Sequence, residues 1–265
     1  MVTGVKLHSS VLNSSEQLSA SPDLPPLLLL HGLFGMGDNL AGVGRALQDH
    51  FTVYKLDLRN HGRSERSDIM TFAAMAADVA LFMDENNMPR AAILGHSLGG
   101  KVGMQLAINY PEKVKRLIVA DIAPATYKGG HTDVFAGLKA VDLQTIKTRR
   151  DADIALAEHI DEEMIRLFIL KNLYRNSDGQ FDWRLNVDAV IAAYPQLCLG
   201  MEGQQPFDGP VLFIKGELSP YVRDVHMPLI KQLFPQSAIK VIANAISPIF
   251  TNCFFIDYLF LVLLN

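Results

Sequence analysis

The chain has 265 residues, of which 49% are hydrophobic and 20% charged, and a net charge of −4 at pH 7. This is the composition of a globular protein with enough apolar material for one sizeable core. The negative net charge provides no basic surface to attract nucleic acid or an anionic membrane, so we expect neither partner. The composition leaves the oligomeric state open.

From the first ten residues and the cysteines, we expect a protein that stays where it is made. Residues 1–10 lack the basic start and apolar run of an export signal. The two cysteines, Cys198 and Cys253, have no partners at the spacing of a disulfide framework or a zinc site. We therefore expect a cytoplasmic location and no metal ion.

Short apolar runs alternate along the chain with segments of helix length. Residues 1–25 are rich in serine and predict no element. The later runs predict buried strands at 27–30, 51–58, 91–95, 117–120, 211–214 and 239–242. This alternation predicts an α/β fold whose mostly parallel central sheet carries helices on both faces.

The alternation of short apolar runs and helix-length segments stops between residues 127 and 205. Amphipathic segments at 142–159 and 161–176 dominate, no buried strand is expected, and Ser177-Asp178-Gly179 is a turn signal. We interpret 127–205 as an inserted helical cap, with 1–126 and 206–265 forming the core.

A nucleophile motif follows the predicted strand at 91–95. It reads Gly95-His96-Ser97-Leu98-Gly99-Gly100 and precedes a helical segment at 101–109. G-x-S-x-G between a strand and a helix is typical of a sharp turn that strains the serine and exposes its Oγ. A chance match in a glycine loop is the alternative, which the position of the motif in the strand order disfavours. Ser97 is therefore the predicted nucleophile.

A second loop can stabilise the charge that such a nucleophile creates. His31-Gly32-Leu33-Phe34-Gly35 follows the strand at 27–30, where a backbone N–H can face a developing oxyanion. The predicted donors are the amides of Leu33 and Leu98. We expect Phe34 and His96 to contact the substrate, and His31 to brace the loop rather than act as a base.

A carboxylate is needed to orient the base, and two candidates stand at strand ends. Asp121 follows the strand at 117–120, and Glu217 follows the strand at 211–214. A short carboxylate at the end of the strand next to the nucleophile can reach a histidine beside Ser97. Asp121 is the preferred acid and Glu217 the alternative.

Taken together, several motifs resemble one family. They are the two loops above, the Gly37-Asp38-Asn39 segment, the run from Asp57 to Ser64, Asp121-Ile122-Ala123-Pro124 and Ser219-Pro220-Tyr221-Val222. Over residues 27–245 the chain is similar to small bacterial α/β-hydrolase esterases of the YbfF type. The resemblance implies hydrolysis of carboxylic esters or acyl thioesters by a Ser, Asp, His triad under a helical cap, without a cofactor. We expect the run at 57–64 to shape its loop, with its charges pairing locally.

The chain departs from this family after residue 245. The family histidine follows the last strand, but here the last histidine of the sequence is His226, predicted on a solvated surface helix. Residues 253–264 are apolar except for Asp257, and this stretch is short for a membrane span of about 20 residues. A shift of reading frame near codon 246 is one hypothesis for this ending.

The leading hypothesis is therefore a serine hydrolase of carboxylic esters or acyl thioesters whose general base is unresolved. One rival is an acyl-binding homologue that has lost turnover with its triad histidine. A second rival is a damaged product that folds poorly, since an exposed apolar terminus favours aggregation.

Overall fold

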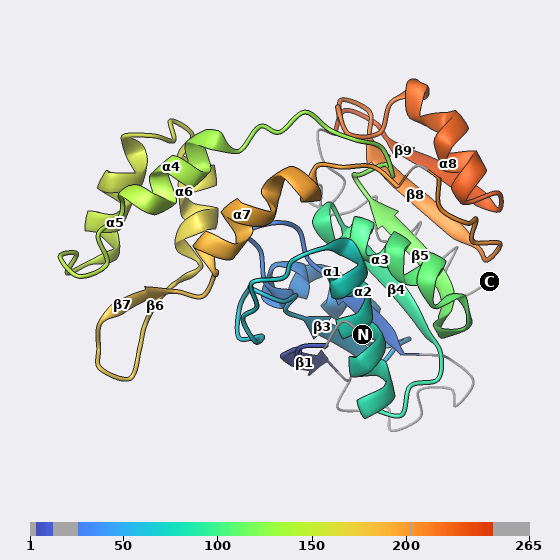
Figure 1. The fold of residues 1–265 in the computed structure, drawn as a ribbon, viewed down its shortest axis with the longest axis horizontal. Coiled ribbons are helices and arrows are strands. Elements are labelled where there is room, and N and C mark those ends of the chain that lie inside the picture. The colour runs from blue at the N-terminus through green and yellow to red at the C-terminus, as the bar shows by residue number, and fades with distance from the viewer. Residues whose placement is uncertain (1–3, 13–25, 202, 246–265) are drawn as a thin grey trace.

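The computed structural model describes residues 4–12, 26–201 and 203–245. Its main sheet has seven strands in the order β1-β3-β2-β4-β5-β8-β9, and only β1 runs antiparallel to its neighbour (Figure 1). The strands are β1 Ser9–Leu12, β2 Leu27–Leu30, β3 Val53–Leu56, β4 Ala91–His96, β5 Val114–Ala120, β8 Val211–Gly216 and β9 Ser237–Ile242. The predicted mostly parallel sheet is confirmed.

Alternate residues of these strands enter two different apolar clusters, as the pleat of a strand requires. Leu28, Leu30 and Ile93 belong to one cluster, and Leu27 and Leu29 belong to the other. Helices α2 Phe72–Glu85, α3 Leu98–Asn109 and α8 Met227–Leu233 contribute to the first, and α1 Ala41–Leu47 contributes to the second. Both faces of the sheet therefore carry helices, as predicted.

The segment from 127 to 205 lies outside the main sheet. It contains α4 Thr132–Ala140, α5 Arg149–Ala157, α6 Glu163–Leu170, α7 Val187–Leu197 and a hairpin of β6 Leu173–Arg175 with β7 Phe181–Trp183. Figure 1 shows α4, α5, α6 and the hairpin gathered to one side of the sheet, with α7 leading back to it. Short 3₁₀ turns at Gly37–Leu40, Pro111–Lys113 and Asp224–His226 complete the assignment.

Two predictions about secondary structure were wrong. The serine-rich start contains β1, a four-residue strand that pairs with β3. The segment at 161–176 ends as a helix at Leu170 and continues into β6 of the hairpin, which turns at the predicted Ser177-Asp178-Gly179. Strands this short carry too few residues for an alternating pattern to be recognised.

The charges of the run at 57–64 do not all pair locally as predicted. Asp57 does bind nearby backbone, accepting hydrogen bonds from the N–H groups of Gly37 at 2.7 Å and Arg63 at 2.9 Å. Arg59 instead forms a buried ion pair with Asp78 of α2, with two N–O distances of 2.6 Å. This run therefore ties its loop to α2 as well as shaping the loop itself.

Candidate active site

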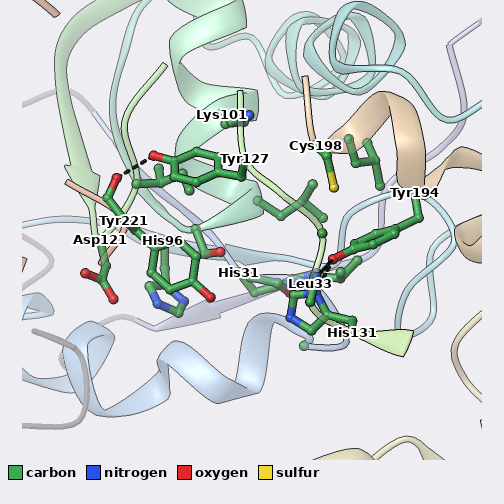
Figure 2. Close-up of a pocket in the computed structure, with 18 of the residues that line it drawn as sticks. His31, Leu33, His96, Lys101, Asp121, Tyr127, His131, Tyr194, Cys198 and Tyr221 are labelled. Carbon is green, nitrogen blue, oxygen red and sulfur yellow. Dashed lines mark hydrogen bonds between the residues drawn. The ribbon is translucent and has the colours of Figure 1, made fainter. Parts of the chain in front are cut away.

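A pocket of about 430 Å³ opens where β2, β4 and β5 end (Figure 2). One side is formed by loops of the core, which contribute Gly32, Leu33, His96, Ser97, Leu98 and Asp121. A second part of the lining comes from residues 127–205 and includes Tyr127, His131, Phe168, Lys171, Tyr194 and Cys198. The predicted Ser97, Asp121, Leu33, Leu98 and His96 are thus brought to one cavity.

Ser97 stands at a strained turn between β4 and α3. Its φ of 50° and ψ of −113° are unusual for a residue with a side chain. Its N–H donates to the carbonyl of Ala120 at 2.9 Å, and its own carbonyl accepts from Lys101 in the first turn of α3. A Cβ at Gly99 would lie 2.2 Å from the carbonyl oxygen of Leu30, so only glycine lets α3 approach β2 this closely.

Asp121 occupies the matching position on the neighbouring strand. His96 and Ala120 are paired in the parallel register of β4 and β5, so Ser97 and Asp121 each come next after a paired residue. Asp121 also has a positive φ, of 61°, and its N–H donates to the carbonyl of Ile214 on β8. Its side chain is buried, and it lines the pocket.

Glu217, the alternative acid, is placed differently. Its carboxylate accepts a hydrogen bond from the N–H of Asn244 at 2.9 Å, and the residue is exposed. It is not one of the residues that line the pocket with Ser97. Of the two candidate carboxylates, Asp121 is the one that faces the cavity.

His31 holds the loop that carries Leu33. Its Nε2 accepts from the N–H of Leu58 at 2.9 Å, so the proton lies on Nδ1, which is 2.8 Å from the carbonyl oxygen of Gly32. The ring is fully buried, and this burial lowers the pKa of His31 to about 4. Both ring nitrogens of this neutral imidazole are engaged, which agrees with the predicted bracing role.

The N–H groups of Leu33 and Leu98 make no hydrogen bond to another residue in the described part of the chain. Both residues line the pocket, and Leu98 is the first residue of α3, where backbone N–H groups lack a partner within the helix. Two backbone N–H groups without a partner among the described residues therefore belong to residues that line the cavity with Ser97.

The two residues predicted to contact substrate are placed differently. His96 lines the pocket, and burial lowers the pKa of its imidazole to about 4. Phe34 does not line it: with a φ of 62° and only 4% exposure, its ring packs edge-on against His131 and Phe135 of the 127–205 segment. Phe34 thus lies behind the pocket wall.

His226 and His131 are two further histidines that could be considered as the general base. His226 is only 7% exposed and packs against the ring of Tyr127, so the prediction of a solvated helix residue was wrong. It does not line the pocket. His131 does line it, with Nδ1 2.5 Å from the hydroxyl of Tyr194, and burial lowers its pKa.

Sequence reasoning missed the wall formed by Tyr127, His131 and Tyr194. The hydroxyl of Tyr127 accepts from the N–H of Ala123 at 2.8 Å and donates to the carbonyl of Tyr221. Burial raises the pKa of Tyr127, so this hydroxyl stays protonated. These residues follow no motif, and only the folded structure brings them together.

Comparisons with known proteins identify the family. The sequence pattern of the alpha/beta hydrolase fold matches residues 25–246. The chain belongs to the alpha/beta hydrolase fold family. Esterase YbfF of Escherichia coli K12 is 37% identical over 221 residues, which cover 83% of this chain and 85% of that protein. The sn-1-specific diacylglycerol lipase ABHD11 of Xenopus laevis is 38% identical over 229 residues, covering 83% and 73%.

A solved structure agrees with this membership. A marine microorganism esterase superposes with a TM-score of 0.85 at 38% identity, covering 91% of this chain and 92% of its own. The predicted resemblance to small bacterial esterases is thereby confirmed, and these relatives support classification of the chain as a hydrolase. The family match ends at residue 246, and the tail beyond it lies outside the described residues.

Within the part of the chain that the structure describes, no group of three His, Cys, Asp or Glu side chains is arranged to hold a metal ion. The helices of that same part are all too short or too polar to cross a membrane. The prediction of a cytoplasmic, metal-free protein remains a prediction.

Proposed function

We propose that this hydrolase cleaves carboxylic esters or acyl thioesters with Ser97 as its nucleophile. The observation that carries the proposal is the placement of Ser97 and Asp121. Both have a positive φ, both follow paired residues on neighbouring strands, and both line one pocket. Strain of this kind persists only where the surrounding structure enforces it, and it is concentrated at functional sites.

In the proposed reaction, the Oγ of Ser97 attacks the acyl carbon and the alcohol or thiol departs with a proton. Water then attacks the acyl-serine ester, which releases the carboxylic acid and restores the serine. The N–H groups of Leu33 and Leu98 stabilise the oxyanion in both steps. Asp121 orients the general base, which is the role of the aspartate in the Ser, Asp, His triad of the family that the sequence resembles.

Residues 127–205 form the cap in this proposal, over a core of 1–126 and 206–265. The cap contributes Phe168, Tyr194 and Leu197 to the pocket, while the core contributes Leu40, Phe72 and Ile122. These apolar side chains suit an acyl chain. The names of the esterase and lipase relatives support an ester as the substrate.

Acyl binding without turnover is the second candidate function, and a specific observation favours it. The sequence contains no histidine after His226, and His226 does not line the pocket. Of the three pocket imidazoles among the described residues, His31 uses both nitrogens in its loop and His131 is bound to Tyr194. The third, His96, has its pKa lowered to about 4 by burial, which makes it a weak base. Loss of the histidine in a serine hydrolase triad costs on the order of 10⁶-fold in kcat.

Hydrolysis of p-nitrophenyl acetate and butyrate by the purified chain and by Ser97→Ala separates the two candidates. We expect the wild type to exceed Ser97→Ala by roughly 10³-fold or more, since the serine is needed for the covalent step. Equal rates in two folded proteins would reject the hydrolase. Calorimetric binding of a non-hydrolysable alkyl ketone to both proteins would then identify the acyl-binding protein.

A further inference from the structure

Asn172 connects the cap to the loop that carries Leu33. It follows α6, its side chain is 1% exposed, and its Nδ2 donates to the carbonyl of Phe34 at 2.8 Å. The same nitrogen lies 3.2 Å from the carbonyl oxygen of Ile169. Two carbonyl oxygens therefore face this atom, so it must be the amino nitrogen of the side-chain amide.

The hydrogen bond from Asn172 continues through the backbone toward Leu33. The carbonyl of Phe34 belongs to the same peptide group as the N–H of Gly35, and that N–H donates to the carbonyl of Gly32 at 3.0 Å. The carbonyl of Gly32 in turn shares its peptide group with the N–H of Leu33. In a trans peptide these two groups point in opposite directions, so fixing one fixes the other.

Two hydrogen bonds in series thus link the cap amide to the peptide group that contains the Leu33 N–H, through the single peptide group of Phe34 and Gly35. In such a chain each hydrogen bond polarises the next, which strengthens the terminal N–H as a donor. His31 binds the same Gly32 carbonyl from the core side, at 2.8 Å. The direction of the Leu33 N–H is consequently set from both the core and the cap.

Asn172 carries a cost that a purely packing residue would avoid. Its Oδ1 is buried and has no hydrogen-bond partner among the described residues. An unsatisfied buried acceptor costs about 1–3 kcal/mol. Leucine has a similar shape without this cost, so the donor Nδ2 is the feature that explains an asparagine here. Phe34, which it holds, is itself in the left-handed region at a φ of 62°.

We propose that Asn172 is a positioning residue through which the cap aligns and polarises the Leu33 N–H, so that the oxyanion hole is complete only when the cap is seated. The expected effect on kcat rests on the proposed function. The alignment of the Leu33 N–H does not depend on turnover, so the test measures both the Leu33 amide signal and kcat.

The alignment is measured by NMR on the full chain labelled with [1-¹³C]glycine and [¹⁵N]leucine. Only leucine amides that follow glycine give a signal that links the two labels, and the sequence has two, Gly32-Leu33 and Gly137-Leu138. We expect the Leu33 amide proton to move upfield in Asn172→Leu and Asn172→Ala, because its peptide loses polarisation. Leu138, within α4, reports whether the cap stays folded.

Asn186→Asp is the matched control. Asn186 also ties the cap to the core, because its Nδ2 donates to the Oδ1 of Asn60 at 3.0 Å, but this contact does not lead to Leu33. Aspartate keeps the oxygen that caps α7 at Ala189. We expect the Leu33 signal to stay in place in this variant. An unmoved Leu33 signal in a folded Asn172 variant, or an equal shift in Asn186→Asp, would overturn the proposal.

Kinetics with p-nitrophenyl butyrate provide the second readout. We expect kcat of Asn172→Leu and Asn172→Ala to fall roughly tenfold with KM unchanged, a fraction of the 10²–10³ that loss of a whole oxyanion donor costs. An unchanged kcat in either folded variant would contradict the positioning role. If the wild type shows no turnover that depends on Ser97, the proposed function fails, and the Leu33 signal alone decides the alignment.

Discussion

The two sides of the pocket are held in different ways. On the core side, backbone atoms bind backbone atoms: Ser97 to Ala120, Asp121 to Ile214, and Gly99 to the carbonyl of His31. On the cap side, the connections to the core run mainly through side chains. They include Asn172 to Phe34, Asn186 to Asn60, Arg66 to Trp183 and the ammonium of Lys101 to Leu199.

Under the proposed function, this difference means that the nucleophile and the acid are held by backbone contacts, whereas the cap is attached mainly through side chains. Backbone hydrogen bonds hold the turns that present Ser97 and Asp121, and Gly99 allows the close approach of α3 that the Ser97 turn requires. Substitutions that disturb backbone packing on the core side should therefore cost far more than comparable substitutions in the cap.

The largest effect is expected from Gly99→Ala. The new Cβ would lie 2.2 Å from the carbonyl oxygen of Leu30 and 2.7 Å from that of His31, so α3 could not pack on β2. We expect the free energy of unfolding to fall by more than about 4 kcal/mol, or the chain to become insoluble. Urea unfolding followed by circular dichroism measures the change.

Gly130→Ala is the control for this prediction on the cap side. Gly130 lines the pocket, and nothing lies within 4 Å of a Cβ added there. Its free energy of unfolding should stay within about 0.5 kcal/mol of the wild type. Similar losses for the two alanine variants would remove the distinction between the two sides.

The next largest effect concerns ion pairs. Arg59 and Asp78 are each 1% exposed, whereas Lys139 and Asp188 of the cap are 55% and 79% exposed. Arg59→Met leaves a buried carboxylate without its partner and should cost about 3–5 kcal/mol. Lys139→Met should cost less than about 1 kcal/mol, because water screens the exposed pair. Equal changes in thermal and urea unfolding would contradict this ranking.

The same difference between the core side and the cap side explains which features the sequence alone could predict. The bounds of β2, the turn at Ser97 and the position of Asp121 directly after β5 follow from local signals, because strand period, glycine spacing and turn chemistry act over a few residues. The short edge strand β1 escaped prediction, because half of it is serine and its pairing with β3 supplies its stability.

The cap side of the site could not be predicted in this way. Asn172 and Phe34 are 138 positions apart, and no sequence pattern indicates that the Asn172 side chain contacts the Phe34 carbonyl. The burial of His226 against Tyr127 has the same origin, since Tyr127 lies in a distant segment. Contacts of this kind depend on the packing of whole elements, so an interpretation based on local periodicity misses them.

The smallest expected effect is a difference in pH dependence between the two sides. Burial lowers the pKa of His31 and His96 to about 4, and of His61 to about 3. The unfolded chain binds these protons near pH 6.5 and the folded chain only below pH 4, so the free energy of unfolding should fall as the pH drops through this interval. Each such group contributes at most about 1.4 kcal/mol per pH unit.

Variants at single histidines show whether the core or the 127–205 segment gives rise to this pH dependence. His61→Gln should remove about 1.4 kcal/mol per pH unit between pH 6 and pH 4, since this fully buried ring stays neutral in the folded protein throughout that range. His131→Gln should remove less, because His131 is only partly buried in the cap wall, and burial is what lowers its pKa. Urea unfolding of the three proteins at half-unit pH steps measures the slopes. Equal slopes for the two variants would mean that the cap wall excludes water as completely as the core does.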